Sequence, residues 1–172
     1  MAEVSSGSQR PARRWVTKRI TVPVTLKRAC DEFNTGRYFE CHETLEEVWQ
    51  EEQGEVRDLY KGLIQLAAAF VHVSRGSFIG ANRLLQTGVG YLSPYRAAGA
   101  MGFEVDRICR EAETAHAAVA TLGPGGLAGF DLALAPRFAC DSAALCREAG
   151  RWQAWGFDAE GLPLEMTIEV AE

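Results

Sequence analysis

Residues 33–49, with the sequence FNTGRYFECHETLEEVW, combine a turn signal with a helical pattern that contains ionisable side chains. Asn34 and Gly36 are typical of a helix C-terminus and predict that one helix ends here and another begins directly after it. At about 100° per residue, His42 and Glu46 fall within the apolar arc of the second helix. Because an unpaired charge is costly to bury, these two side chains need partners, and we expect a site here.

The bulk composition indicates one globular domain. The chain has 172 residues, of which 47% are hydrophobic and 24% charged, and it contains no apolar run long enough to span a membrane. Arg10, Arg13 and Arg14 interrupt the N-terminal segment before the apolar stretch of a secretory signal could form. The five cysteines form no Cys-x-x-Cys pair, which favours reduced thiols over a disulfide or zinc framework. These features predict a cytoplasmic protein without membrane contacts.

The net charge of −5 is unevenly distributed. Residues 1–19 carry five basic groups and one acid, whereas the rest of the chain is strongly acidic. The acidic body argues against nucleic-acid binding. The basic segment could contact nucleic acid or an acidic partner, but its Ser- and Gly-containing start favours a solvated leader.

Hydrophobic periodicity predicts an all-α fold, a helical bundle of about five helices with an irregular C-terminal tail. We expect a flexible basic leader at 1–22, the helical bundle domain at 23–123, and a C-terminal extension at 124–172 that packs on the bundle. The first helix is predicted to start at Pro23 and to end at Asn34 and Gly36, and the others are predicted near residues 37–52, 55–75, 78–92 and 103–122. A weak pattern near 142–152 is compatible with a further short helix, and Leu164–Val170 indicates an extended tail.

The helix at 55–75 is apolar around most of its circumference, which is typical of a bundle's central helix. Its narrow polar stripe contains Asp58, Lys61, Gln65 and His72. The short turn at Gly54 makes the helices before and after it antiparallel neighbours. In an antiparallel pair, residues at similar distances from the turn lie side by side. With the turn centred on residue 53, we expect Glu46 to pair with Lys61 and His42 with Gln65.

A metal site is the alternative interpretation of these polar groups. His42, Glu46 and His72 would form a set of two histidines and one carboxylate. However, His72 lies seven residues beyond Gln65, about 10 Å along the helix axis, so we expect no bound metal or other cofactor. The run from His42 to Glu46 begins like a zinc-protease helix, but that motif needs histidine in place of Glu46. Glu43 is predicted to be a surface acid.

Two blocks of the sequence carry a family resemblance. The first is FNxGxYFExHExLExxW at residues 33–49, and the second is KGLIQLAAAFxH at residues 61–72. Together they resemble a bacterial and archaeal helical family catalogued as domain of unknown function family 309. The resemblance implies an all-α bundle and no established activity. It also implies that the signature polar residues here are His42, Glu43, Glu46, Lys61, Gln65 and His72.

Three hypotheses of function follow. The first is a small polar molecule or peptide bound in a polar pocket between the second and third helices. Its expected site residues are Tyr38, His42, Glu43, Glu46, Trp49, Lys61, Gln65 and His72. The second is a hydrolase-like enzyme with a divalent transition metal held by His42 and Glu46, joined by His72 in the full set. The third is a structural or protein-interaction module, in which the apolar faces of the last two helices could also form a homodimer.

Overall fold

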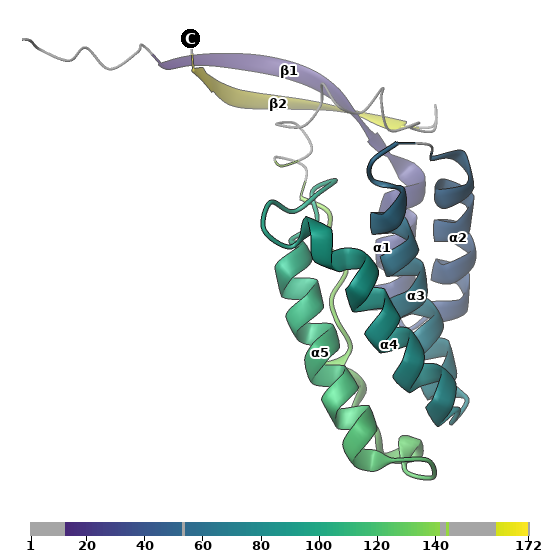
Figure 1. Ribbon diagram of the computed structural model, residues 1–172. Helices are drawn as coiled ribbons and strands as arrows, with labels where there is room; N and C mark the ends of the chain where they lie inside the picture. Colours follow the sequence, from purple (N-terminus) through teal and green to yellow (C-terminus); the bar gives the residue numbers. More distant parts are fainter. Residues whose placement is uncertain (1–12, 53, 142–143, 145–160, 172) are drawn as a thin grey trace, which may run out of the picture.

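A computed structural model of the chain describes residues 13–52, 54–141, 144 and 161–171. Five α-helices form the body within this part of the chain, which confirms the predicted all-α bundle (Figure 1). They are α1 (Val24–Asn34), α2 (Tyr38–Glu51), α3 (Arg57–Ser74), α4 (Phe78–Leu92) and α5 (Val105–Leu122). Short 3₁₀ turns follow α4 (η1, Ser93–Tyr95) and α5 (η2, Leu127–Gly129, and η3, Leu132–Leu134).

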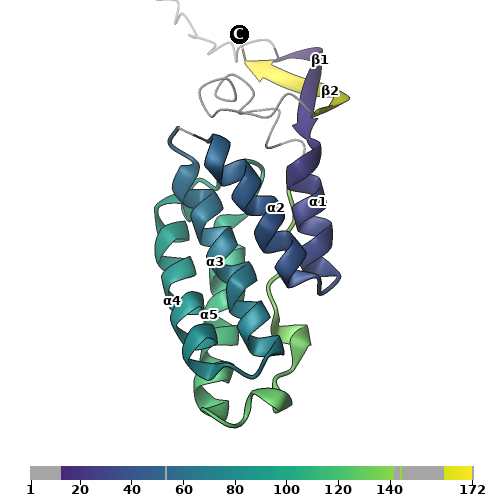
Figure 2. The ribbon, with the colours of Figure 1, turned by 90° about the vertical axis from the view of Figure 1, so that its right-hand side faces the viewer.

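Each helix packs on the next in chain order, so α3 lies between α2 and α4 (Figure 2). Short connections favour such neighbours, because a brief turn returns the chain along the helix it has just left. The turn between α1 and α2 follows the predicted signal: Gly36 has a φ of +79°, and Arg37 donates its backbone N–H to the Glu32 carbonyl at 2.8 Å.

An aromatic cluster closes one end of the core. Phe33 stacks on Phe138 with ring centroids 3.7 Å apart, and Tyr38 and Phe70 pack around them. The Asn34 side chain binds the segment after α5 to the end of α1. Its amide nitrogen donates to the Phe138 carbonyl at 2.6 Å, and its amide oxygen accepts from the Phe138 N–H at 2.9 Å. The segment after α5 therefore completes the core of the bundle.

Glycines allow α3 and α4 to approach closely. A Cβ atom on Gly62 would lie 2.6 Å from Leu92 Cγ, and one on Gly80 would lie 2.4 Å from His72 Nδ1. Most of α3 is buried, as expected for the central helix.

Among the described residues, no helix is both long and apolar enough to cross a membrane. Four cysteines, Cys30, Cys41, Cys109 and Cys140, are free thiols, while Cys146 is outside the described residues.

The end segments form a two-stranded antiparallel ribbon, β1 (Arg13–Pro23) and β2 (Gly161–Ala171), with Arg13 opposite Ala171 and Pro23 opposite Gly161. The flexible leader expected at 1–22 is therefore corrected for residues 13–22, which belong to β1. Residues in β1 such as Val16, Thr17 and Ile20 have strand propensity, but a partner about 150 residues away gives no local signal. The short helix considered near 142–152 falls mostly outside the described residues.

Candidate functional site

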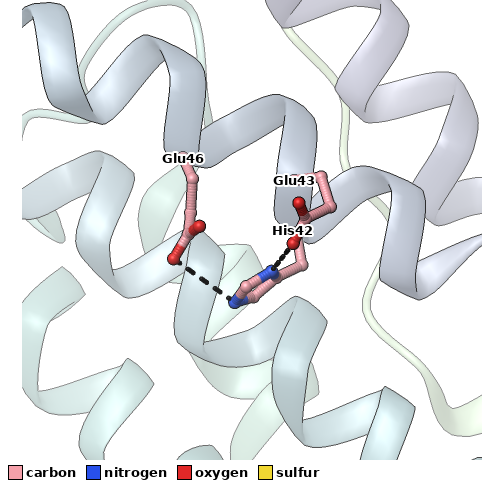
Figure 3. A group of neighbouring side chains, drawn as sticks. All are labelled: His42, Glu43 and Glu46. Atoms are coloured by element: carbon pink, nitrogen blue, oxygen red, sulfur yellow. Dashed lines mark hydrogen bonds and ion pairs between the residues drawn. The ribbon is translucent and has the colours of Figure 1, made fainter.

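Three side chains on α2, those of His42, Glu43 and Glu46, converge at the surface of the bundle (Figure 3). The imidazole Nδ1 lies 3.1 Å from a Glu43 oxygen, and Nε2 lies 3.6 Å from a Glu46 oxygen. One ligand atom from each residue lies within 4.8 Å of the other two. The exposed fractions of the side chains are 25% for His42, 55% for Glu43 and 39% for Glu46, so solvent reaches all three.

The packing of α2 explains this position. Tyr38, Cys41, Thr44 and Leu45 are buried, so α2 turns a face centred near Cys41 and Leu45 toward the core. Thr44 is buried at 5% exposure although it is polar, and α1 packs against α2. This rotation leaves His42 and Glu46 at the edge of the buried face, where one helical turn brings them together.

The Lys61 side chain lies beside Trp49 and not beside Glu46, as had been predicted. Its ammonium is 4.8 Å from the centre of the Trp49 ring, and the Arg57 guanidinium is 4.0 Å from the same ring. Arg57 also donates to the Trp49 carbonyl at 2.9 Å, which fixes it beside the turn between α2 and α3. Glu46 has His42 as its ionic neighbour, so the predicted Glu46–Lys61 pair is wrong. Trp49 is thus a cation-binding surface for α3.

Gln65 faces α4, because its side-chain oxygen accepts a hydrogen bond from the Thr87 hydroxyl. The predicted pairing of His42 with Gln65 is therefore replaced by His42–Glu43 and His42–Glu46 contacts within α2. The predicted pairings assumed that the polar stripe of α3 faces α2. With α3 placed between α2 and α4, part of that stripe meets α4 instead.

The side chains of His72 and Tyr38 pack against other parts of the fold. His72 Nδ1 is buried without a hydrogen-bond partner, and its ring fills the space above Gly80. The set His42, Glu46 and His72 is not brought together, and Glu43 takes the third place. Tyr38 is 8% exposed within the aromatic cluster, and burial raises the pKa of its hydroxyl.

A ligand pocket was expected between the second and third helices, and the hollow that lies there is lined by one of the expected residues, Tyr38. A groove of about 200 Å³ lies between the start of α2 and the end of α3. It is lined by Gly36, Tyr38, Phe39, Glu40, Val71, Ser74 and Arg75. A hollow of about 520 Å³ lies beside the start of α5. Phe39 was not among the predicted site residues, although its spacing of three residues from His42 already placed both on neighbouring positions of one helix.

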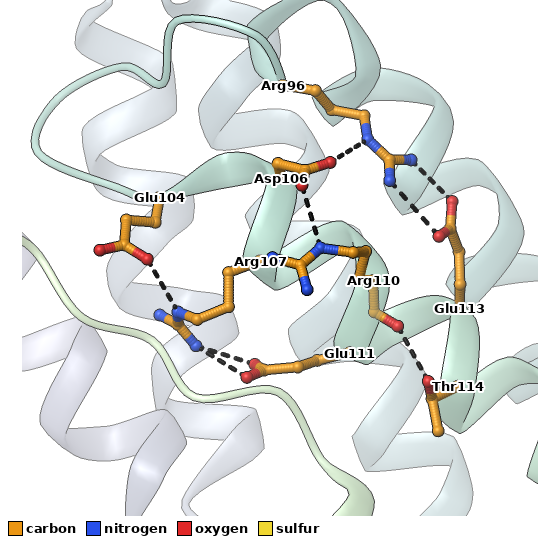
Figure 4. A network of polar contacts seen from close by, with 8 residues as sticks. All are labelled: Arg96, Glu104, Asp106, Arg107, Arg110, Glu111, Glu113 and Thr114. Carbon is orange, nitrogen blue, oxygen red and sulfur yellow. Dashed lines mark hydrogen bonds and ion pairs between the residues drawn. The ribbon is translucent and has the colours of Figure 1, made fainter.

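A second polar cluster surrounds the first two turns of α5 (Figure 4). Arg96 contacts Asp106 at 3.0 Å and Glu113 at 2.7 Å, and Arg110 contacts Asp106 at 2.9 Å. Hydrogen bonds from Arg96 and Arg110 lower the pKa of the Asp106 carboxyl. Arg107 reaches Glu111 at 2.9 Å. Each of these guanidinium groups is already matched by carboxylates.

Comparison with known proteins agrees with the sequence motifs. Residues 26–84, which include most of α1, all of α2 and α3, and the His42 cluster, match the family model described as "Domain of unknown function (DUF309)". Uncharacterized protein YpuF of Bacillus subtilis (strain 168) is 36% identical over 94 residues, or 53% of this chain and 54% of that protein. The chain thus spans about half the length of this curated relative, and no solved structure shows a significant match. The match over residues 26–84 and the similarity to this relative support the assignment of that segment to the DUF309 family.

Proposed function

We propose that the chain binds a divalent transition-metal ion through His42, Glu43 and Glu46, and that a small polar ligand or peptide group completes the coordination. The observation that carries this proposal is the convergence of one nitrogen and two carboxylate oxygens within 4.8 Å on a single helix. An imidazole combined with carboxylates suits zinc and neighbouring transition metals.

The spacing of the ligand atoms supports a shared ion. Two ligands that are each about 2.1 Å from a tetrahedral zinc ion lie about 3.4 Å apart. The 3.6 Å between His42 Nε2 and the Glu46 oxygen is close to this separation and longer than an ordinary hydrogen bond. Glu43 lies on the other ring nitrogen, where a carboxylate can orient the imidazole or rotate to become a third ligand.

The exposure of the cluster supports an open site rather than a closed structural one. A metal ion held by two or three protein ligands keeps positions for water, and bound water is activated by the metal charge. Such a site would suit a hydrolase, which stays a hypothesis beside simple ligand binding. The four free thiols favour a reducing compartment, in keeping with a cytoplasmic location.

The test is metal binding by untagged protein. Elemental analysis after zinc loading and dialysis should give one equivalent, and calorimetric titration with Zn²⁺ should give one site. His42→Ala should weaken zinc binding about a hundredfold and Glu46→Gln at least about tenfold, because each removes a ligand. Co²⁺ should give the visible absorption of a tetrahedral or five-coordinate ion in the wild-type protein.

Two substitutions serve as matched controls. Glu51→Gln removes an exposed acid near the end of the same helix, and His116→Ala removes a histidine that instead contacts Asn82 at 2.8 Å. Both should leave zinc affinity unchanged. Equal zinc affinity in wild type and His42→Ala would contradict the proposal and would leave a structural polar contact as the interpretation of this cluster.

A further inference from the structure

We propose that the groove between α2 and α3 seats the apolar group of the ligand whose carboxylate reaches the metal ion at His42. The ligand class is a monocarboxylic acid with one phenyl or branched aliphatic group. This inference rests on the proposed metal site for the carboxylate, whereas the groove itself is a separate observation.

The groove presents apolar surface that the fold leaves open. Phe39, the second residue of α2, keeps 53% of its surface exposed although its neighbour Tyr38 is buried. Val71 of α3 also lines the groove, and Gly36 at the turn has nothing within 4 Å of where a Cβ would lie. An aromatic ring on one side and a branched side chain on the other form walls for an apolar group.

Phe39, which lines the groove, is also the neighbour of His42 in the metal cluster. The Phe39 ring and the His42 imidazole are 6.4 Å apart between centroids and inclined by only 18°. The 6.4 Å between the two ring centroids corresponds to about four carbon–carbon bond lengths. This spacing matches an acid with a short chain between its apolar group and its carboxylate.

The volume limits the apolar group. A cavity of about 150 Å³ lined by apolar side chains holds one benzene molecule. The groove of about 200 Å³ is therefore large enough for a single phenyl ring or an isobutyl group and too small for a fused ring system with substituents.

The charges in the groove place the carboxylate at the metal. The lining contains one acid, Glu40, and one base, Arg75, and no salt bridge between them is found in the described part of the chain. These charges cancel, so the groove alone offers no net attraction for an anion. The metal ion at the neighbouring cluster would offer an open coordination position to the carboxylate, and the groove supplies selectivity for the apolar group.

The experiment compares 3-phenylpropanoate with propanoate by calorimetry on the zinc-loaded full-length protein. We expect the phenyl compound to bind about tenfold more tightly, because the groove removes its ring from water. In Phe39→Ala this preference should fall to less than about twofold while zinc affinity stays unchanged. Ser74→Trp, which places a bulky ring in the lining, should lose the phenyl compound and keep propanoate. Ile79→Ala removes a side chain that is 80% exposed outside the groove and should behave as wild type.

The outcomes separate the two proposals. Equal affinity for both acids in the zinc-loaded wild type would overturn the proposal that the groove binds the apolar group. An undiminished preference for the phenyl compound in Phe39→Ala would overturn it as well. If the protein binds no zinc, the metal proposal fails by itself, and NMR on the metal-free protein then decides about the groove. Amide shifts at Phe39 and Val71 caused by 3-phenylpropanoate but not by propanoate would support the groove, and their absence would overturn it.

Discussion

The two polar clusters of this bundle are built from similar residue types but differ in how their charges are balanced. On α2, two carboxylates surround one imidazole, and no Lys or Arg in the described part of the chain forms a salt bridge with them. Beside α5, guanidinium groups are interleaved with carboxylates, so each acid has an adjacent cation. A cluster with uncompensated carboxylates retains oxygen atoms that can coordinate a cation, whereas a matched network has already used them. This difference is why the proposed function lies on α2.

The largest expected effect is a metal-dependent stabilisation that only the α2 cluster provides. Zinc at about 100 times its Kd should raise the free energy of unfolding by about 2.7 kcal/mol, because the ion binds the folded state. Thermal unfolding with and without zinc measures this difference. His42→Ala should abolish it, and Arg96→Gln in the other cluster should leave it intact. If Arg96→Gln abolished the stabilisation by zinc and His42→Ala left it intact, zinc would bind at the α5 cluster and not at the α2 cluster.

A second prediction concerns the histidine that the sequence grouped with the metal ligands. Gly80→Ala places a methyl group about 2.4 Å from His72 Nδ1, so the ring or the helix must shift. We expect a loss of about 1–3 kcal/mol in the free energy of unfolding, as is usual for overpacking, with zinc affinity unchanged. Urea unfolding and calorimetry measure the two quantities.

Gly90→Ala provides the control for this change, because nothing lies within 4 Å of a Cβ at that position of the same helix. It should be neutral or slightly stabilising, since alanine is the better helix former. If Gly80→Ala weakened zinc binding by more than about tenfold, His72 would belong to the metal site after all.

The helices and the cluster differed in how far the sequence could predict them. Helical periodicity located all five helices, and the signal at Asn34 and Gly36 placed the turn before α2, because these features depend on neighbours within a few residues. The convergence of His42 and Glu46 was predictable for the same reason, since four residues make one helical turn. Pairings between helices were predicted wrongly, because they depend on how α3 is rotated between two partners.

The groove and the ribbon were missed for a similar physical reason. Phe39 reads as one more apolar residue of an amphipathic helix, and its exposure follows only from the placement of α2 against α3. The strand β1 is paired with β2, whose residues lie at the other end of the chain. Contacts that join distant segments leave no local pattern in a single sequence.

A third prediction tests whether the α5 network is matched as the comparison requires. Arg96→Gln removes the cation shared by Asp106 and Glu113 and should lower the melting temperature at low ionic strength. In about 1 M salt the difference from wild type should shrink, because screening already weakens exposed ion pairs there. Arg83→Gln, an exposed arginine on α4, should show no such salt dependence. A deficit that stays constant with salt would show that Arg96 acts through packing.

The smallest expected effect is a pH dependence confined to acid. Hydrogen bonds from Arg96 and Arg110 lower the pKa of Asp106 from its ordinary value of 3.8, so the folded state favours the ionised carboxylate. This contribution to stability is present above about pH 4 and is lost as the pH falls through the lowered pKa. Asp106→Asn should therefore be less stable than wild type at pH 6 and approach it near pH 2, measured by urea unfolding across the range. Asp58→Asn on the exposed side of α3 supplies the control. If the deficit of Asp106→Asn persisted at pH 2, the loss would come from altered contacts of this side chain rather than from its charge.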